Sequence, residues 1–255
     1  MPMKFIHFTD IHQLQAGQSL HGLNPHERLQ ACLDSINQFH DDAEFCVITG
    51  DLAHRGEDHA YRLLLDQLDQ VKMPCHLVIG NHDHRETFKN CCKHVKSDIE
   101  GFVQYTVETN SGVFVMLDTV TKPGSDLGAY CKQRQDWLQK TLIKHQNEPV
   151  FLFMHHPPFE IHIPAFDKPA FNDKNAFSEM VHSFKNIRHL FFGHTHRPIF
   201  GNWQGISFSS MRSTNHQVEL NFKEPSELKF CDEKPEYAVV FLTDESVVIH
   251  SHSYL

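Results

Sequence analysis

The chain has 255 residues, of which 40% are hydrophobic and 22% are charged, a composition typical of a folded globular protein. Its net charge is −9 and its 23 basic residues form no cluster, which argues against a nucleic acid polymer held through its phosphate backbone. The seven cysteines include no Cys-x-x-Cys pair, and their number is odd. A disulfide framework and a thiolate zinc site are therefore disfavoured, and a reducing compartment is favoured.

The N-terminal residues MPMKFIHFTD lack the charged region and the long apolar region of a signal peptide. Nowhere along the chain does an apolar run approach the length of a membrane span. We therefore expect a cytoplasmic protein without a membrane partner.

Short apolar runs alternate with amphipathic stretches, which is the rhythm of a layered α/β fold. Six of these runs are rich in Val, Ile and Phe and are bounded by polar residues, as buried strands are. The predicted strands cover residues 4–10, 45–51, 75–81, 113–119, 150–156 and 189–194.

Helices are predicted between these strands. The first begins at Asn24-Pro25, where the asparagine supplies an N-cap, the proline takes the first helical position and Glu27 follows three residues after the cap. Leu29 and Leu33 then continue an apolar pattern at helical spacing. Further helices are predicted over 57–71, 131–146 and 174–186.

The C-terminal fifty residues read differently, as strands over 203–209, 236–242 and 246–252 that we expect to pair antiparallel. No repeat and no linker interrupts the chain. We expect one domain over residues 1–255, in which residues of about 201–255 form C-terminal strands that serve as a cap or an oligomerisation element.

Polar residues follow five of the six predicted strands, at the carboxyl end of each. In open α/β sheets these ends form the crevice where ligands bind. The stretches are Asp10-Ile11-His12, Gly50-Asp51, Gly80-Asn81-His82-Asp83, His155-His156 and Gly193-His194-Thr195-His196. Each one alone is an ordinary turn composition, and about two His-x-His pairs are expected by chance among 22 histidines. All five in order at successive strand ends indicate a single site.

This ordered set resembles the motifs of the calcineurin-like metallophosphoesterase family, from residue 5 to about residue 200. The stretches HGLNPHERL, MPCHLVIGNHD, LFMHHPPF and STNHQV resemble the bacterial branch of class III cyclic nucleotide phosphodiesterases and glycerophosphodiesterases. The resemblance implies an α/β metallophosphoesterase fold, a four-layer αββα sandwich of two mixed β-sheets flanked by helices. It also implies a homo-oligomer, a dimer or higher, assembled through the C-terminal strands.

The same resemblance implies two adjacent divalent metal ions per chain. Seven residues fill the ligand positions of the family: Asp10, His12 and His196 for the first ion, Asn81, His155 and His194 for the second, and Asp51 for both. Nitrogen and oxygen ligands without thiolate suit Mn, Fe or Zn. A hydroxide that bridges the two ions would attack phosphorus in line.

The resemblance gives His82 and Asp51 catalytic positions, and Asn81, His82 and His216 positions that contact the substrate. For His82, both phosphate contact and proton donation to the leaving group stay open, with Asp83 expected to orient the ring. Phosphoprotein phosphatases have an acidic partner for this histidine shortly after Gly-Asp, whereas this chain has His54 there. For His216, an ordinary histidine on a strand face is an equal alternative.

The predicted function is that of a binuclear metal-dependent phosphodiesterase. Its substrates would be small phosphodiesters, either 3′,5′-cyclic nucleotides or glycerophosphodiesters. Loops around 17–28, 120–130 and 157–175 are expected to supply the pocket contacts that distinguish these substrates. The proline- and phenylalanine-rich stretch 157–174 is expected to wall off a pocket for the second ester substituent. One alternative is a phosphomonoesterase or nuclease with the same metal centre. The other is a non-catalytic scaffold of the same fold, which the complete ligand set disfavours.

Overall fold

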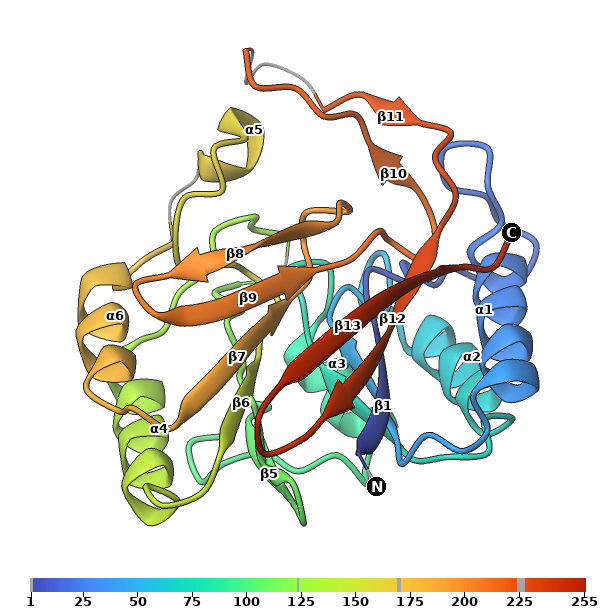
Figure 1. Ribbon diagram of the computed structural model, residues 1–255. Helices are drawn as coiled ribbons and strands as arrows, with labels where there is room; N and C mark the ends of the chain where they lie inside the picture. Colours follow the sequence, from blue (N-terminus) through green and yellow to red (C-terminus); the bar gives the residue numbers. More distant parts are fainter. Residues whose placement is uncertain (1, 123, 169–170, 224–227) are drawn as a thin grey trace.

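The computed structural model describes residues 2–122, 124–168, 171–223 and 228–255. Two mixed β-sheets pack face to face, and helices cover the outer face of each sheet (Figure 1). The predicted four-layer αββα architecture is confirmed. None of the helices in these residues is long and apolar enough to cross a membrane.

The first sheet has the strand order β13-β12-β1-β2-β3. Its strands are β1 (Met3–Phe8), β2 (Cys46–Thr49), β3 (Cys75–Val78), β12 (Glu236–Leu242) and β13 (Val247–Ser253). β1, β2 and β3 are parallel, whereas β12 runs antiparallel to both of its neighbours, β1 and β13. The helices packed on the outer face are α1 (Pro25–Phe39), α2 (Asp58–Leu68) and α3 (Arg85–Cys91).

The second sheet has the strand order β4-β5-β6-β7-β9-β8. Its strands are β4 (Tyr105–Thr109), β5 (Gly112–Met116), β6 (Val150–Phe153), β7 (Ile187–Phe192), β8 (Ile199–Trp203) and β9 (Ile206–Ser210). β5, β6, β7 and β9 are parallel, and the two edge strands are antiparallel. Helices α4 (Lys132–Lys144) and α6 (Lys174–His182) cover its outer face.

Phenylalanines fill the space between the two sheets. Alternate residues of a strand point to one face, so Phe5 of β1 meets Phe153 and Phe191 of the second sheet. Phe153 and Phe191 stack with their ring centroids 4.7 Å apart, and all three side chains are fully buried. Aromatic pairs in this geometry stabilise a core beyond the area that they bury. The inter-sheet layer therefore sets how the two sheets are placed relative to each other.

All six predicted strands and all four predicted helices are present. Asn24 caps α1 as expected, because its side-chain oxygen accepts a hydrogen bond from the His26 backbone N–H at 3.1 Å. The prediction of antiparallel pairing at the C-terminus holds for β12 and β13 but is wrong in part for β9, which pairs parallel with β7 on one side. The reason is that β8 reverses the chain before β9 enters the sheet.

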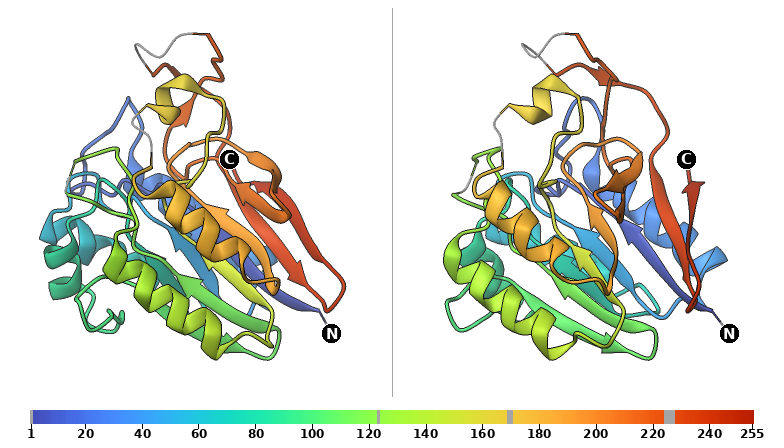
Figure 2. Two further views of the ribbon diagram at one scale, coloured as in Figure 1. Left: turned by 90° about the vertical axis from the view of Figure 1, so that its left-hand side faces the viewer. Right: turned by 60° about the vertical axis from the view of Figure 1, so that its left-hand side comes forward.

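The carboxyl ends of the parallel strands in both sheets lie at the same end of the molecule. Short elements lie at this end as well: helix α5 (Pro164–Asp167) and the ribbon of β10 (Gln217–Val218) and β11 (Phe230–Cys231) (Figures 1 and 2). Backbone hydrogen bonds tie the strand ends together: the Asp10 N–H donates to Gly50 O at 3.1 Å, and the Gly193 N–H donates to His155 O at 3.1 Å. Residues from distant parts of the sequence therefore meet at one edge.

Candidate metal centre

The strand-end turns hold their side chains through an uncommon backbone conformation. Five of the seven predicted ligands have a positive φ: Asp10 (56°), His12 (53°), Asp51 (50°), His194 (68°) and His196 (52°). Non-glycine residues rarely adopt this left-handed region, and such strained positions cluster at functional sites. The turns are stabilised by the surrounding structure so that the side chains point into a common centre.

Two glycines make room for this convergence. Gly50 has a φ of 96°, and a Cβ atom there would collide with the Nδ1 atom of His155. A Cβ atom on Gly193 would collide with the Thr9 hydroxyl. The apolar run of β7 therefore ends in glycine because the chain passes directly against the end of β1, and the two histidines that follow then face the centre.

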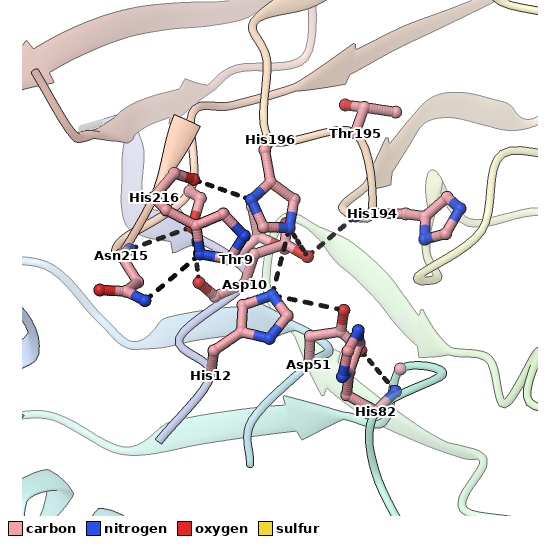
Figure 3. A network of polar contacts seen from close by, with 12 residues as sticks. Thr9, Asp10, His12, Asp51, His82, His194, Thr195, His196, Asn215 and His216 are labelled. Carbon is pink, nitrogen blue, oxygen red and sulfur yellow. Dashed lines mark hydrogen bonds and ion pairs between the residues drawn. The ribbon is translucent and has the colours of Figure 1, made fainter. Parts of the chain in front are cut away.

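A first group of side chains consists of Asp10, His12, Asp51 and His196, whose ligand atoms all lie within 4.8 Å of one another. The Nε2 atoms of His12 and His196 are 3.1 Å apart. Asp51 Oδ2 lies 3.6 Å from His12 Nε2, and Asp10 Oδ1 lies 3.5 Å from His196 Nε2. Figure 3 shows these four side chains pointing toward one another. All four are buried.

A second group consists of Asn81, His155, His194 and again Asp51. Asn81 Oδ1 lies 2.9 Å from His155 Nε2 and 3.0 Å from His194 Nδ1. Asp51 Oδ1 lies 3.4 Å from His155 Nε2, while its other oxygen faces the first group. The structure thus brings all seven predicted residues together in two groups that share one carboxylate.

Hydrogen bonds made by the outer atoms of these side chains direct their other nitrogen and oxygen atoms at the centre. His155 Nδ1 donates to Thr49 O at 2.8 Å, and His196 Nδ1 donates to His216 O at 2.8 Å. Because a carbonyl oxygen only accepts, both rings carry a proton on Nδ1, and Nε2 is the nitrogen that each ring presents to the centre. The Asn81 amide donates to Asp126 Oδ1 at 3.1 Å, so its oxygen faces the histidines. Nitrogen and oxygen atoms that converge in this way fit a metal cation.

The charge balance points the same way. The side chains of Asp10 and Asp51 are almost fully buried, and within the described part of the chain their ion-pair contacts are only with histidines. Burial raises the pKa of Asp10. For Asp51 burial acts in the same direction, but the neighbouring His155 and His82 hold its pKa well below the usual range. A buried carboxylate needs a cationic partner, and divalent ions would supply one for this set.

His82 lies beside the shared carboxylate. Its backbone N–H donates to Asp51 Oδ1 at 2.9 Å, and its ring Nδ1 donates to His54 O at 2.8 Å. The rings of His54 and His82 stack with their centroids 4.8 Å apart. Burial alone would lower the pKa of His82, but the Asp51 charge and the hydrogen bond to His54 O raise it. His54, which stands where phosphoprotein phosphatases have an acidic partner, therefore holds the His82 ring through its backbone carbonyl.

Asp83 does not orient the His82 ring, contrary to our expectation. Its carboxylate accepts hydrogen bonds from the backbone N–H groups of Leu52, Ala53 and Gly80 at 2.8–3.0 Å and from the Tyr61 hydroxyl at 2.9 Å. A carboxylate can accept this many bonds, whereas a histidine contact would use only one. Asp83 instead joins the turn that carries Asp51 to the turn that carries Asn81.

Sequence reasoning missed two positioning contacts. Arg28, within the HGLNPHERL stretch, donates to Asn215 O at 3.1 Å and so holds the STNHQV stretch beside the centre. His156 is buried, its Nδ1 lies 2.7 Å from the Thr119 hydroxyl, and its ring packs against both His155 and His194. The only sequence signal for either was its place next to a motif.

A cavity of about 190 Å³ opens above the two groups. Its base contains His82 and His216 together with the predicted ligands His12, Asp51, Asn81, His194 and His196. Six further residues form what we call the pocket wall: His21, Ala165, Phe166, Val218, Leu228 and Phe230. Ala165 and Phe166 belong to the stretch 157–174 that was expected to border a pocket; residues 169–170 of that stretch lie outside the described residues.

Fold and site together define a class of protein. Residues 3–198 match the family model of calcineurin-like phosphoesterases, and the chain belongs to this family. A dimetal phosphatase from Danio rerio has a similar structure, with a TM-score of 0.74 over 99% of this chain and 96% of that chain. At 14% sequence identity, this likeness concerns the fold alone.

Two relatives give a narrower comparison. The chain is 36% identical, over 99% of its own length and 93% of the relative's, to a protein of Rhodopseudomonas palustris named "probable cyclic nucleotide phosphodiesterase". It is 25% identical, over 99% of its length and 93% of the relative's, to a protein of Arcobacter nitrofigilis named "probable glycerophosphodiester phosphodiesterase". The predicted family and its bacterial phosphodiesterase branch are confirmed.

Proposed function

We propose that this protein hydrolyses small phosphodiesters at a centre of two divalent metal ions. The observation that carries the proposal is the position of Asp51, which presents one carboxylate oxygen to each of two groups of nitrogen and oxygen ligands. The names of the relatives support diester hydrolysis, with 3′,5′-cyclic nucleotides or glycerophosphodiesters as substrates.

Each ion would take three ligands of its own and share Asp51. Asp10, His12 and His196 would hold one ion, and Asn81, His155 and His194 the other. This donor set without thiolate suits Mn, Fe or Zn. Such ions activate water as a nucleophile and neutralise the charge that develops on phosphorus-bound oxygens.

Residues of the chain would orient the diester and assist the leaving group. His82 is fixed through Nδ1 by His54 O, which leaves Nε2 as its free ring nitrogen. We propose that this nitrogen donates a hydrogen bond to the phosphate or a proton to the departing alkoxide. His216 and Asn81 line the same cavity, and we propose that they contact the substrate.

Comparison of a diester with the corresponding monoester tests this function. We expect a higher kcat/KM for bis-p-nitrophenyl phosphate than for p-nitrophenyl phosphate, because a monoester leaves the pocket wall without a partner and forgoes its binding energy. Both substrates are assayed at one metal loading, with cyclic AMP and glycerophosphoethanolamine as the alkyl diesters. The Asp51→Asn variant serves as the background control. A preference for the monoester would favour the phosphomonoesterase alternative instead.

We further propose that residues 1–255 form one domain of a cytoplasmic homo-oligomer. The edge strand β13 supports this assembly, because its seven residues include no Asp, Glu, Lys or Arg and Val248 is 42% exposed. An uncharged edge is a template for a strand of another chain, and a symmetric pair of β13 strands would close it. The seven cysteines, all free, support a reducing compartment.

A further inference from the structure

The pocket wall differs in chemistry from the metal centre beneath it. Val218 and Phe230 come from the β10–β11 ribbon, and Phe166 comes from α5 on the other side of the cavity. The ring of Phe230 stacks on His21 with centroids 3.7 Å apart and an interplanar angle of 29°. Phe230 is nevertheless 44% exposed and Leu228 is 42% exposed. Apolar and aromatic surface is therefore presented at the mouth of a polar site.

The charge of this wall limits what it can bind. Among the described residues that line the cavity there is no lysine or arginine, and the carboxylates are those of Asp51 and Asp126. A substituent with a second phosphate or a carboxylate would find no counter-charge here apart from the ions that hold the reacting phosphate. The wall instead matches an uncharged group with a flat apolar face.

The position of the aromatic side chains specifies the shape of that group. The rings of His21, His216 and Phe230 form a cluster, in which the His216 centroid lies 4.7 Å from that of His21 and 5.1 Å from that of Phe230. The His216 ring in turn lies 4.9 Å from His12 in the metal centre. On the other side, the Phe166 ring meets the edge of His194 at 5.4 Å. Aromatic surface thus continues from the site of the phosphate to the mouth of the cavity on both sides.

We propose that the pocket wall binds the uncharged aromatic base of a nucleoside phosphodiester, which stacks on the ring face of Phe230 that His21 leaves uncovered. This inference depends on the proposed function and narrows its substrate class to cyclic nucleotides. Bases stack on aromatic side chains whatever their sequence identity, because every base has a π-face. Phe230 is then a specificity-determining residue of the site.

A pair of substrates that differ only in the base isolates this contribution. We compare cyclic AMP with the abasic ribose 3′,5′-cyclic phosphate, measuring kcat/KM for the metal-loaded protein. Phe230→Ala should lower kcat/KM for cyclic AMP by about tenfold, the usual effect of losing one stacked ring. The same variant should change kcat/KM for the abasic substrate by no more than about twofold. Phe230→Tyr keeps the ring and should keep the preference.

The matched control is Phe222→Ala. Phe222 belongs to the same segment and is 61% exposed, but it does not line the cavity. This variant should retain the wild-type ratio between the two substrates. An equal loss on both substrates in Phe230→Ala, at unchanged melting temperature, would overturn the inference, because the ring would then act on the metal centre and not on a base.

Binding of adenosine separates this inference from the proposed function, since it requires no turnover. We expect adenosine to bind the wild-type protein in NMR titration and to bind the Phe230→Ala variant about tenfold more weakly. If no phosphodiester is hydrolysed but adenosine binds in this way, the proposed function is wrong and the inference that the pocket wall binds a base is supported. If base-free diesters are hydrolysed but adenosine does not bind, the proposed function is supported and the inference that the pocket wall binds a base is wrong.

Discussion

The metal centre and the pocket wall lie on the same cavity but are constructed differently. The metal centre is buried, and its side chains leave strand ends in left-handed turns that backbone hydrogen bonds and Asp83 hold in place. The wall consists mostly of partly exposed apolar and aromatic residues on short elements and loops. Metal ligation requires lone pairs fixed to within a few tenths of an ångström, whereas binding of a flat apolar group requires surface. Under the proposed function, reaction chemistry and substrate choice would belong to separate parts of the site.

Loss of the shared carboxylate should have the largest effect. Asp51→Asn removes the one negative charge that faces both ligand groups. We expect kcat/KM for bis-p-nitrophenyl phosphate to fall by more than about 100-fold and metal content to drop below two ions per chain. Metal analysis after reconstitution and steady-state kinetics measure both, with Asp66→Asn on the exposed face of α2 as the control. Two bound ions with near-normal turnover would contradict the ligand assignment.

His82→Ala should separate catalysis from metal binding within the same region. We expect two ions per chain to remain, because the ring is not among the proposed ligands. We expect kcat to fall by about 10²–10⁴-fold if the ring donates a proton. The loss should be smaller with a p-nitrophenolate leaving group than with an alkoxide. His59→Ala, at an exposed site on α2, is the control.

Equal losses on activated and alkyl esters would instead identify His82 as a residue that positions the phosphate. A loss of one ion would assign it to the metal centre.

Asp83→Asn should loosen the metal centre without touching a proposed ligand. The amide would place an N–H group among the donors that now reach the carboxylate from Leu52, Ala53, Gly80 and Tyr61. We expect the free energy of unfolding to fall by about 1–3 kcal/mol, the cost of buried donors left without an acceptor. Denaturant unfolding of the metal-free protein measures it, and Asp69→Asn at the end of α2 is the control. Unchanged stability would show that the two turns are held by other contacts.

Val248→Lys should leave both regions intact and have the smallest effect on activity. A charge on the edge strand β13 disfavours pairing with a second copy, so light scattering should show a smaller assembly, with kcat/KM per chain within about twofold. Ile143→Lys, another exposed apolar position on α4, should not change the assembly. If Val248→Lys keeps the wild-type mass, the oligomer does not form through β13.

Much of the metal centre was predictable from the sequence because its signals are local. Each predicted ligand follows an apolar run of strand length, and the carboxyl ends of parallel strands meet at one edge. The pocket wall carried no comparable signal. Leu228 and Phe230 lie in a segment whose described residues form a single strand of two residues, and His21 is one of 22 histidines. Two parts of the wall were expected to border a pocket: the loop around 17–28, which contains His21, and the stretch that contains Ala165 and Phe166.

By itself, the sequence determined the parallel strands, the helices between them and the order in which ligand residues reach the strand ends. These depend on side-chain periodicity and on turn residues within a few positions. Only the tertiary structure decided that the side-chain oxygen of Asn81, after a strand of the first sheet, lies within 3.0 Å of ring nitrogens of His155 and His194, which follow strands of the second. The tertiary structure also decided that Asp83 joins two turns and that Phe230 stacks on His21. Such contacts depend on how two sheets pack through a shared phenylalanine layer, and that packing is a property of the whole chain.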